Sequence, residues 1–89
     1  MIKTIIRNMT ESKKDFNLTC IDKQTISLMR IEAKATHGGY RYALIDGSYN
    51  RQEIPEICFD EIDETDDSIT VNNKELMIVG TTNEQASNA

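Results

Sequence analysis

The chain has 89 residues, of which 38% are hydrophobic, and a formal net charge of -5. A chain of this length folds as one domain around one modest core, which disfavours an enclosed catalytic cleft. The negative charge disfavours nonspecific attraction to nucleic acid and to anionic membranes.

Residues 2–9 predict a first strand, because Ile2, Ile5, Ile6 and Met9 are apolar and isoleucine favours strands. The two-residue rhythm slips at Ile5 and Ile6, where a bulge or a short helical turn would absorb it. Residues 10–15 are all polar and predict a surface loop. No apolar run here is long enough for a signal peptide or a membrane helix, so we expect a cytoplasmic protein without membrane contact.

Residues 16–21 alternate apolar and polar side chains, which predicts a half-buried strand. Residues 25–35 fit both a strand and a helix. We favour the strand, because His37, Gly38 and Gly39 can form a tight turn into a clear strand at 40–45. The alternative is a helix near 27–35.

A turn is expected at 46–48 and a polar connection at 49–53. Pro55 cannot donate a ladder hydrogen bond, so it marks a strand start, an edge strand or a first helical turn. Residues 56–64 again fit both periods, and we favour a short edge strand whose charges suppress pairing with other chains.

Residues 69–71 and 74–79 predict a hairpin, because Asn72 and Asn73 tolerate the left-handed conformation of a tight turn. Gly80 is expected to end this hairpin. The domain then spans residues 1–80, and residues 81–89 form a disordered polar tail.

About six short strands with short turns predict a mainly β protein, a small antiparallel β-barrel or roll of the SH3-like or Sm-like kind. The block 54–79 resembles such barrels, in which an apolar and acidic strand leads into a hairpin. This resemblance concerns the pattern alone and assigns no functional residue in this chain. The alternative is an α+β roll that contains the helix near 27–35.

Residues 53–67, here called the acidic segment, hold the most unusual composition in the chain. Up to Arg51 the chain has nine Lys or Arg and five Asp or Glu; from Gln52 onward it has one and ten. Apolar residues run through the acidic segment as anchors to the core. The carboxylates predicted to bind a partner are Glu56, Asp60, Glu61, Asp63, Glu64, Asp66 and Asp67.

Outside the acidic segment, the residues that could carry chemistry are the single histidine, the two cysteines and the tyrosines. His37 at a loop tip reads as a turn residue, and we expect no catalytic residue, no metal site and no cofactor. Cys20 and Cys58 adjoin apolar residues and are expected to be buried free thiols, with a bridge as the alternative in an oxidising compartment. Tyr40 and Tyr42 share a strand face near Arg41 and Arg51, which suggests a stacking platform for a small phosphate-bearing ligand.

The leading hypothesis is a non-enzymatic binding module that docks its carboxylates onto a basic, nucleic-acid-binding site of a protein partner, without binding nucleic acid itself. By analogy of kind, small acidic single-domain chains include the inhibitors that phages make against host machinery. The alternatives are a nucleotide or small-ligand sequestering protein and a self-assembling structural subunit whose edge strands pair.

Overall fold

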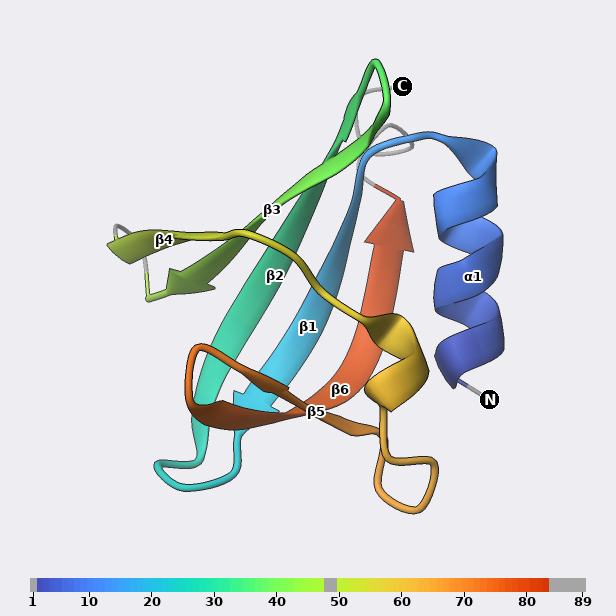
Figure 1. Ribbon diagram of the computed structural model, residues 1–89. Helices are drawn as coiled ribbons and strands as arrows, with labels where there is room; N and C mark the ends of the chain where they lie inside the picture. Colours follow the sequence, from blue (N-terminus) through green and yellow to red (C-terminus); the bar gives the residue numbers. More distant parts are fainter. Residues whose placement is uncertain (1, 48–49, 84–89) are drawn as a thin grey trace.

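A computed structural model describes residues 2–47 and 50–83 and shows six antiparallel strands with one helix beside them (Figure 1). The elements in chain order are α1 (Ile2–Ser12), β1 (Phe16–Asp22), β2 (Ser27–Thr36), β3 (Gly39–Asp46), β4 (Asn50–Ile54), the 3-10 helix η1 (Phe59–Glu61), β5 (Ser68–Val71) and β6 (Lys74–Asn83).

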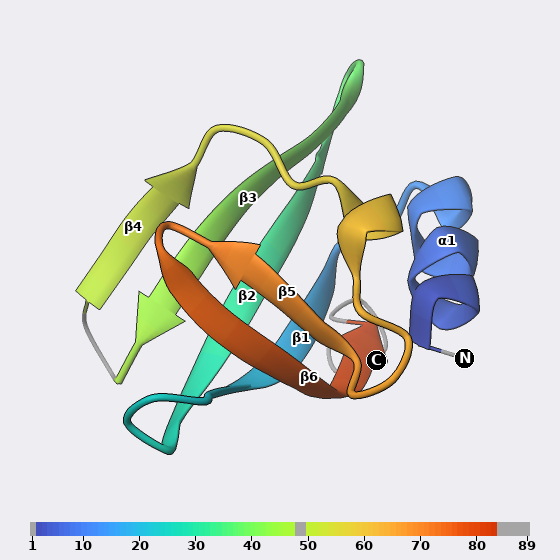
Figure 2. The same ribbon diagram turned by 60° about the horizontal axis from the view of Figure 1, so that its bottom comes forward.

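All strands belong to one sheet with the order β4-β3-β2-β1-β6-β5. The sheet curls strongly into a half-barrel, and the β5–β6 hairpin crosses in front of β1 and β2 (Figure 2). The expectation of a mainly β small roll is thereby confirmed. The alternative of a helix near 27–35 is wrong, because those residues form β2, which pairs with both β1 and β3.

The core fills the concave face of this sheet. Alternate residues of each strand point inward, and the side chains that are fully or almost fully buried include Leu18, Cys20, Ile31, Leu44 and Leu76. The two-residue period of the strands therefore determines which side chains enter the core, as the alternation at 16–21 indicates.

Residues 2–9 form most of α1, so the predicted first strand is wrong. Ile2, Ile6 and Met9 recur at helical spacing and pack against the core, whereas Ile5 lies at the margin of this face and is 40% exposed. The slip at Ile5 and Ile6 was thus the signature of a helical period. The helix lies beside β6 and contacts β6 and η1 (Figure 1).

The helix also occupies part of the loop expected at 10–15. The hydroxyls of Thr10 and Ser12 donate to the carbonyls of Arg7 and Met9, at 2.9 and 2.6 Å. Lys13 then adopts a φ of 59° and donates its N–H to the carbonyl of Thr10, which ends the helix by a left-handed residue.

The polar connection expected at 49–53 is instead the edge strand β4 over residues 50–54; Tyr49 itself lies outside the described residues. β4 pairs with β3 in register, from Asp46 opposite Asn50 to Tyr42 opposite Ile54. Polar side chains suit an edge strand because they discourage pairing with other chains.

The prediction of an edge strand at 56–64 is wrong. Residues 55–58 are irregular, η1 follows, and Asp63 makes only an isolated bridge with Ser68. Pro55 directly follows β4, and acidic residues have low strand propensity, so the apolar residues Ile57, Phe59 and Ile62 pack against the core without a ladder.

The hairpin of β5 and β6 is confirmed, with Asn72 and Asn73 at positive φ in its turn. Gly80 does not end it. β6 runs on to Asn83 beyond a register shift opposite Thr19 and Cys20, so the expected tail is a strand over residues 81–83; its last six residues lie outside the described ranges. A bulge lets one strand change register without ending.

The turn between β1 and β2 is held by Asp22. Its buried carboxylate accepts the backbone N–H groups of Gln24 at 2.9 Å and Thr25 at 3.4 Å, with Lys74 Nζ 3.8 Å away. The hydrogen bond from Gln24 is the first cause that holds the pKa of Asp22 below its ordinary value.

Because this pKa is lowered in the folded chain, the carboxylate stabilises the fold above the ordinary pKa of about 3.9, and the contribution is lost as pH falls through the folded value. We expect Asp22→Asn to lower the urea midpoint at pH 7 and to flatten its decline between about pH 4 and pH 2. Urea titrations across that range measure both effects. An unchanged acid slope in the variant would contradict this role of Asp22.

Candidate functional site: the acidic segment

The acidic segment connects β4 to β5 across the open side of the half-barrel and carries all seven predicted partner-binding carboxylates. Ile57 and Phe59 are half-buried and Ile62 is buried, so three apolar side chains fasten the segment to the core. The backbone is therefore held in place while the carboxylates between these anchors face outward.

Three of the seven carboxylates pair with cations from the first part of the chain. Glu64 lies 3.5 Å from Lys3 and Asp60 lies 3.5 Å from Arg7, both on α1. Asp66 pairs with Lys23, which also contacts Glu75 at 3.2 Å. The other four of the seven, Glu56, Glu61, Asp63 and Asp67, have no ion pair among residues 2–47 and 50–83.

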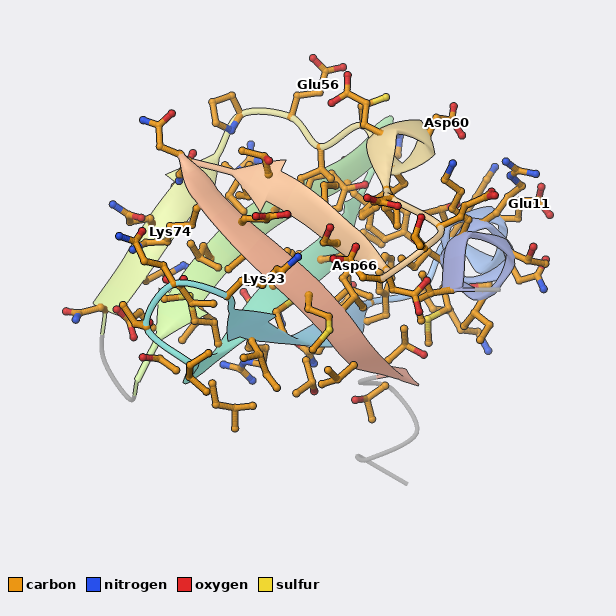
Figure 3. All side chains as sticks on the ribbon, turned by 90° about the horizontal axis from the view of Figure 1, so that it is seen from below. Glu11, Lys23, Glu56, Asp60, Asp66 and Lys74 are labelled. Carbon is orange, nitrogen blue, oxygen red and sulfur yellow. The ribbon has the colours of Figure 1, made fainter. Side chains whose placement is uncertain are left out.

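Asp66 accepts hydrogen bonds from two side chains. The Lys23 ammonium and the Ser68 hydroxyl, which lies 2.7 Å away, both donate to Asp66 and hold its pKa below the ordinary value. The same pairing with Asp66 raises the pKa of Lys23. Asp66 therefore acts mainly within the protein, as its direction toward Lys23 in Figure 3 illustrates.

Glu56, Glu61 and Asp63 are exposed and have no ion pair among the described residues. Glu56 and Asp60 point outward from the connection in Figure 3. Asp63 accepts the N–H of Thr65 at 2.8 Å, which fixes its side chain in a short turn. Asp67 is half-buried, at a φ of 54°, and its carbonyl accepts the N–H of Ile78.

The structure does not bring the proposed ligand-binding residues together. Tyr40 and Tyr42 lie on the concave face of β3, whereas Arg41 and Arg51 lie on the opposite face. Arg51 is engaged by Glu32 at 2.6 Å and by Glu53 at 3.5 Å, and the Glu32 contact is the first cause of its raised pKa.

The tyrosine rings serve internal packing. Tyr40 meets Phe16 edge-on with centroids 5.3 Å apart, Tyr42 stacks on Tyr40 at 6.0 Å, and Phe59 of η1 meets Tyr42 edge-on at 5.7 Å. The Tyr40 hydroxyl donates to the carbonyl of Lys14 at 2.9 Å. Burial raises the pKa of both tyrosines. This aromatic row joins the acidic segment to β3, a role that the spacing of tyrosines alone did not reveal.

The two cysteines differ, and the expectation that both are buried is wrong for Cys58. Cys20 is fully buried in the core and Cys58 is exposed, and both are free thiols. Burial raises the pKa of Cys20 to about 12.

We therefore expect a thiol reagent such as 5,5′-dithiobis(2-nitrobenzoate) to label one cysteine per folded chain at pH 8. Cys58 reacts because it is exposed, and Cys20 reacts only after denaturation. Absorbance of the released thiolate, with Cys58→Ser as the control, measures this. Rapid labelling of the folded Cys58→Ser protein would contradict the buried position of Cys20.

Among residues 2–47 and 50–83, no helix is long and apolar enough to cross a membrane. Within the same ranges, no three His, Cys, Asp or Glu side chains are grouped so that they could hold a metal ion.

The fold and the site together define a small antiparallel β-roll with a structurally anchored acidic connection. Comparison with protein-family models, with curated proteins and with solved structures found no match.

Proposed function

We propose that this protein is a small non-catalytic binding module, an inhibitor or adaptor of the kind that phages make. It docks the carboxylates of the acidic segment onto a basic, nucleic-acid-binding site of a protein partner. The observation that carries the proposal is the trio Glu56, Glu61 and Asp63: exposed, without ion pairs in the described part of the chain, and held on a segment that three apolar residues fasten to the core.

Anchoring matters because a fixed backbone loses little conformational entropy on binding. Free acidic tails also attract basic surfaces, but they must be ordered at a cost when they bind. A segment held by Ile57, Phe59 and Ile62 presents its carboxylates at set positions, as phosphates are presented along a nucleic-acid backbone. The arrangement therefore supports recognition of a matching row of Lys or Arg.

Electrostatics gives the proposal a measurable property. Two unit charges 4 Å apart attract by about 1 kcal/mol in bulk water and about 4 kcal/mol near a protein surface. Salt screens charges that are exposed to solvent, with a Debye length of about 8 Å at physiological ionic strength. Binding carried by the acidic segment should therefore weaken steeply as salt rises.

The experiment is capture of the partner from native host extract with the immobilised protein, followed by titration of the purified partner. We expect the partner to bind nucleic acid, duplex DNA or RNA to compete with the protein for it, and the affinity to fall at least tenfold between about 50 and 300 mM salt. A partner that binds equally at both salt concentrations, or that nucleic acid fails to displace, would overturn the proposal.

The nucleotide-binding alternative has less support. Tyr40 packs on Phe16 and Tyr42 packs on Phe59, while Arg51 is paired with Glu32. The tyrosine rings and the Arg51 guanidinium therefore do not face one ligand site.

A further inference from the structure

The outer edge of β5 carries backbone hydrogen-bonding groups that the sheet does not use. A two-residue turn at Asn72 and Asn73 makes Val71 and Lys74 the hydrogen-bonded pair that closes the hairpin. Pairing alternates along an antiparallel ladder, so the N–H and C=O of Thr70 point away from β6. β5 is a terminal strand of the described sheet, and no strand of residues 2–47 or 50–83 lies beside Thr70.

The neighbouring outward position confirms this direction. Ser68 lies two residues before Thr70, and its carbonyl accepts the N–H of Asp63 at 2.7 Å. This bridge closes the edge at the start of β5. The edge is therefore open from Thr70 toward the hairpin turn.

A groove of about 360 Å³ lies along that open edge, between β5 and residues 54–58. Its apolar lining includes Ile54, Ile57, Ile69 and Val71, and Glu56 and Glu61 line it as well. The groove thus combines outward backbone groups, apolar surface and two of the three exposed carboxylates that have no ion pair in the described part of the chain.

We infer that this groove binds an extended, basic peptide segment of the partner by strand addition to β5. The backbone of the peptide would pair with the N–H and C=O of Thr70, and its alternate side chains would divide between the apolar lining and the carboxylates. The choice of a basic segment follows from Glu56 and Glu61, since opposite charge at an open edge selects Lys or Arg. The inference rests on the proposed function and specifies how the partner is held.

The probe is a short capped peptide of alternating valine and lysine, titrated by NMR and by calorimetry. We expect the amide of Thr70 to shift and to become protected from hydrogen exchange when the peptide binds. A twin peptide of equal charge, N-methylated on alternate backbone nitrogens, cannot form the ladder and is expected to bind at least tenfold more weakly. Equal affinity for the two peptides would overturn strand addition.

Thr70→Pro is the matching change in the protein. Proline removes the outward N–H of Thr70 and leaves the hydrogen bonds of Ile69 and Val71 to β6 in place. We expect at least tenfold weaker peptide binding, whereas Thr70→Val, which keeps the N–H and the strand propensity, stays within about twofold of the wild type. If Thr70→Pro does not fold, strand addition is tested by comparing how the unmodified and the N-methylated peptide bind to the wild-type protein.

Failure of the inference and failure of the proposed function can be told apart. If Glu56→Gln with Glu61→Gln weakens binding but Thr70→Pro does not, docking by charge stands and strand addition is wrong. If Thr70→Pro weakens peptide binding, but the affinity for the captured partner does not change with salt and nucleic acid does not displace the protein, the proposed function is wrong. A dimer in light scattering that Thr70→Pro dissociates would show that the edge pairs with a second copy, which also overturns the inference.

Discussion

Changing Glu56, Glu61 and Asp63 together to lysine is expected to weaken partner binding by at least about 100-fold. Each reversal removes an attraction of about 1 kcal/mol or more at an exposed site and adds a repulsion of similar size. Three such changes sum to several kcal/mol, and each 1.4 kcal/mol is a factor of ten in the dissociation constant. Titration of the purified partner at about 50 mM salt measures the change.

The matched control compares single substitutions of equal charge. Glu61→Lys and Glu11→Lys alter the net charge identically, but Glu11 lies on α1, away from Glu56 (Figure 3). If position matters, Glu61→Lys weakens binding about tenfold and Glu11→Lys much less. Equal effects would mean that the partner senses only the total charge, which contradicts a docking site on the acidic segment.

Replacing Ile6 with alanine is expected to lower the free energy of unfolding by about 2–5 kcal/mol, the cost of removing a large aliphatic side chain from a packed core. Among the described residues of α1, Ile6 alone is buried, and no part of its surface is exposed. Domains of this size lose about 4–8 °C of melting temperature per kcal/mol, so the midpoint should fall by about 10 °C or more. Circular dichroism during heating measures it.

Ile5→Ala provides the control, because it makes the same chemical change one residue away. Ile5 lies at the margin of the apolar face of α1 and is 40% exposed, so its loss should cost only about 1 kcal/mol. Similar midpoints for the two variants would show that α1 does not pack through Ile6. Loss of α1 packing should also weaken partner binding, since Lys3 and Arg7 on α1 hold Glu64 and Asp60 of the acidic segment.

The amino-terminal helix shows why a short sequence pattern can mislead. Isoleucine favours strands, and the neighbours Ile5 and Ile6 resemble a fault in a strand period. The same residues place Ile2, Ile6 and Met9 on one helical face, and packing of that face against the core outweighs the intrinsic preference. The exposure of Ile5 is the residue-level evidence for the helical period.

The acidic segment shows why composition alone does not define a binding surface. The sequence contains its carboxylates, but which of them are neutralised depends on cations far away in the chain. Lys3 meets Glu64 and Arg7 meets Asp60 because α1 lies against η1. Only the structure separates these paired carboxylates from Glu56, Glu61 and Asp63.

Features with local causes could be predicted from the amino-acid sequence. Alternating side chains mark β1, aromatic and apolar residues mark β3, the two asparagines form the turn between β5 and β6, and eight carboxylates lie within fifteen residues of chain. Long-range packing, in contrast, sets the helix α1, the edge strand β4, the contacts of Tyr40 and Tyr42 inside the protein and the open edge at Thr70. Each of these depends on surfaces that residues distant in sequence bury together, and burial is a property of the folded chain that no short segment contains.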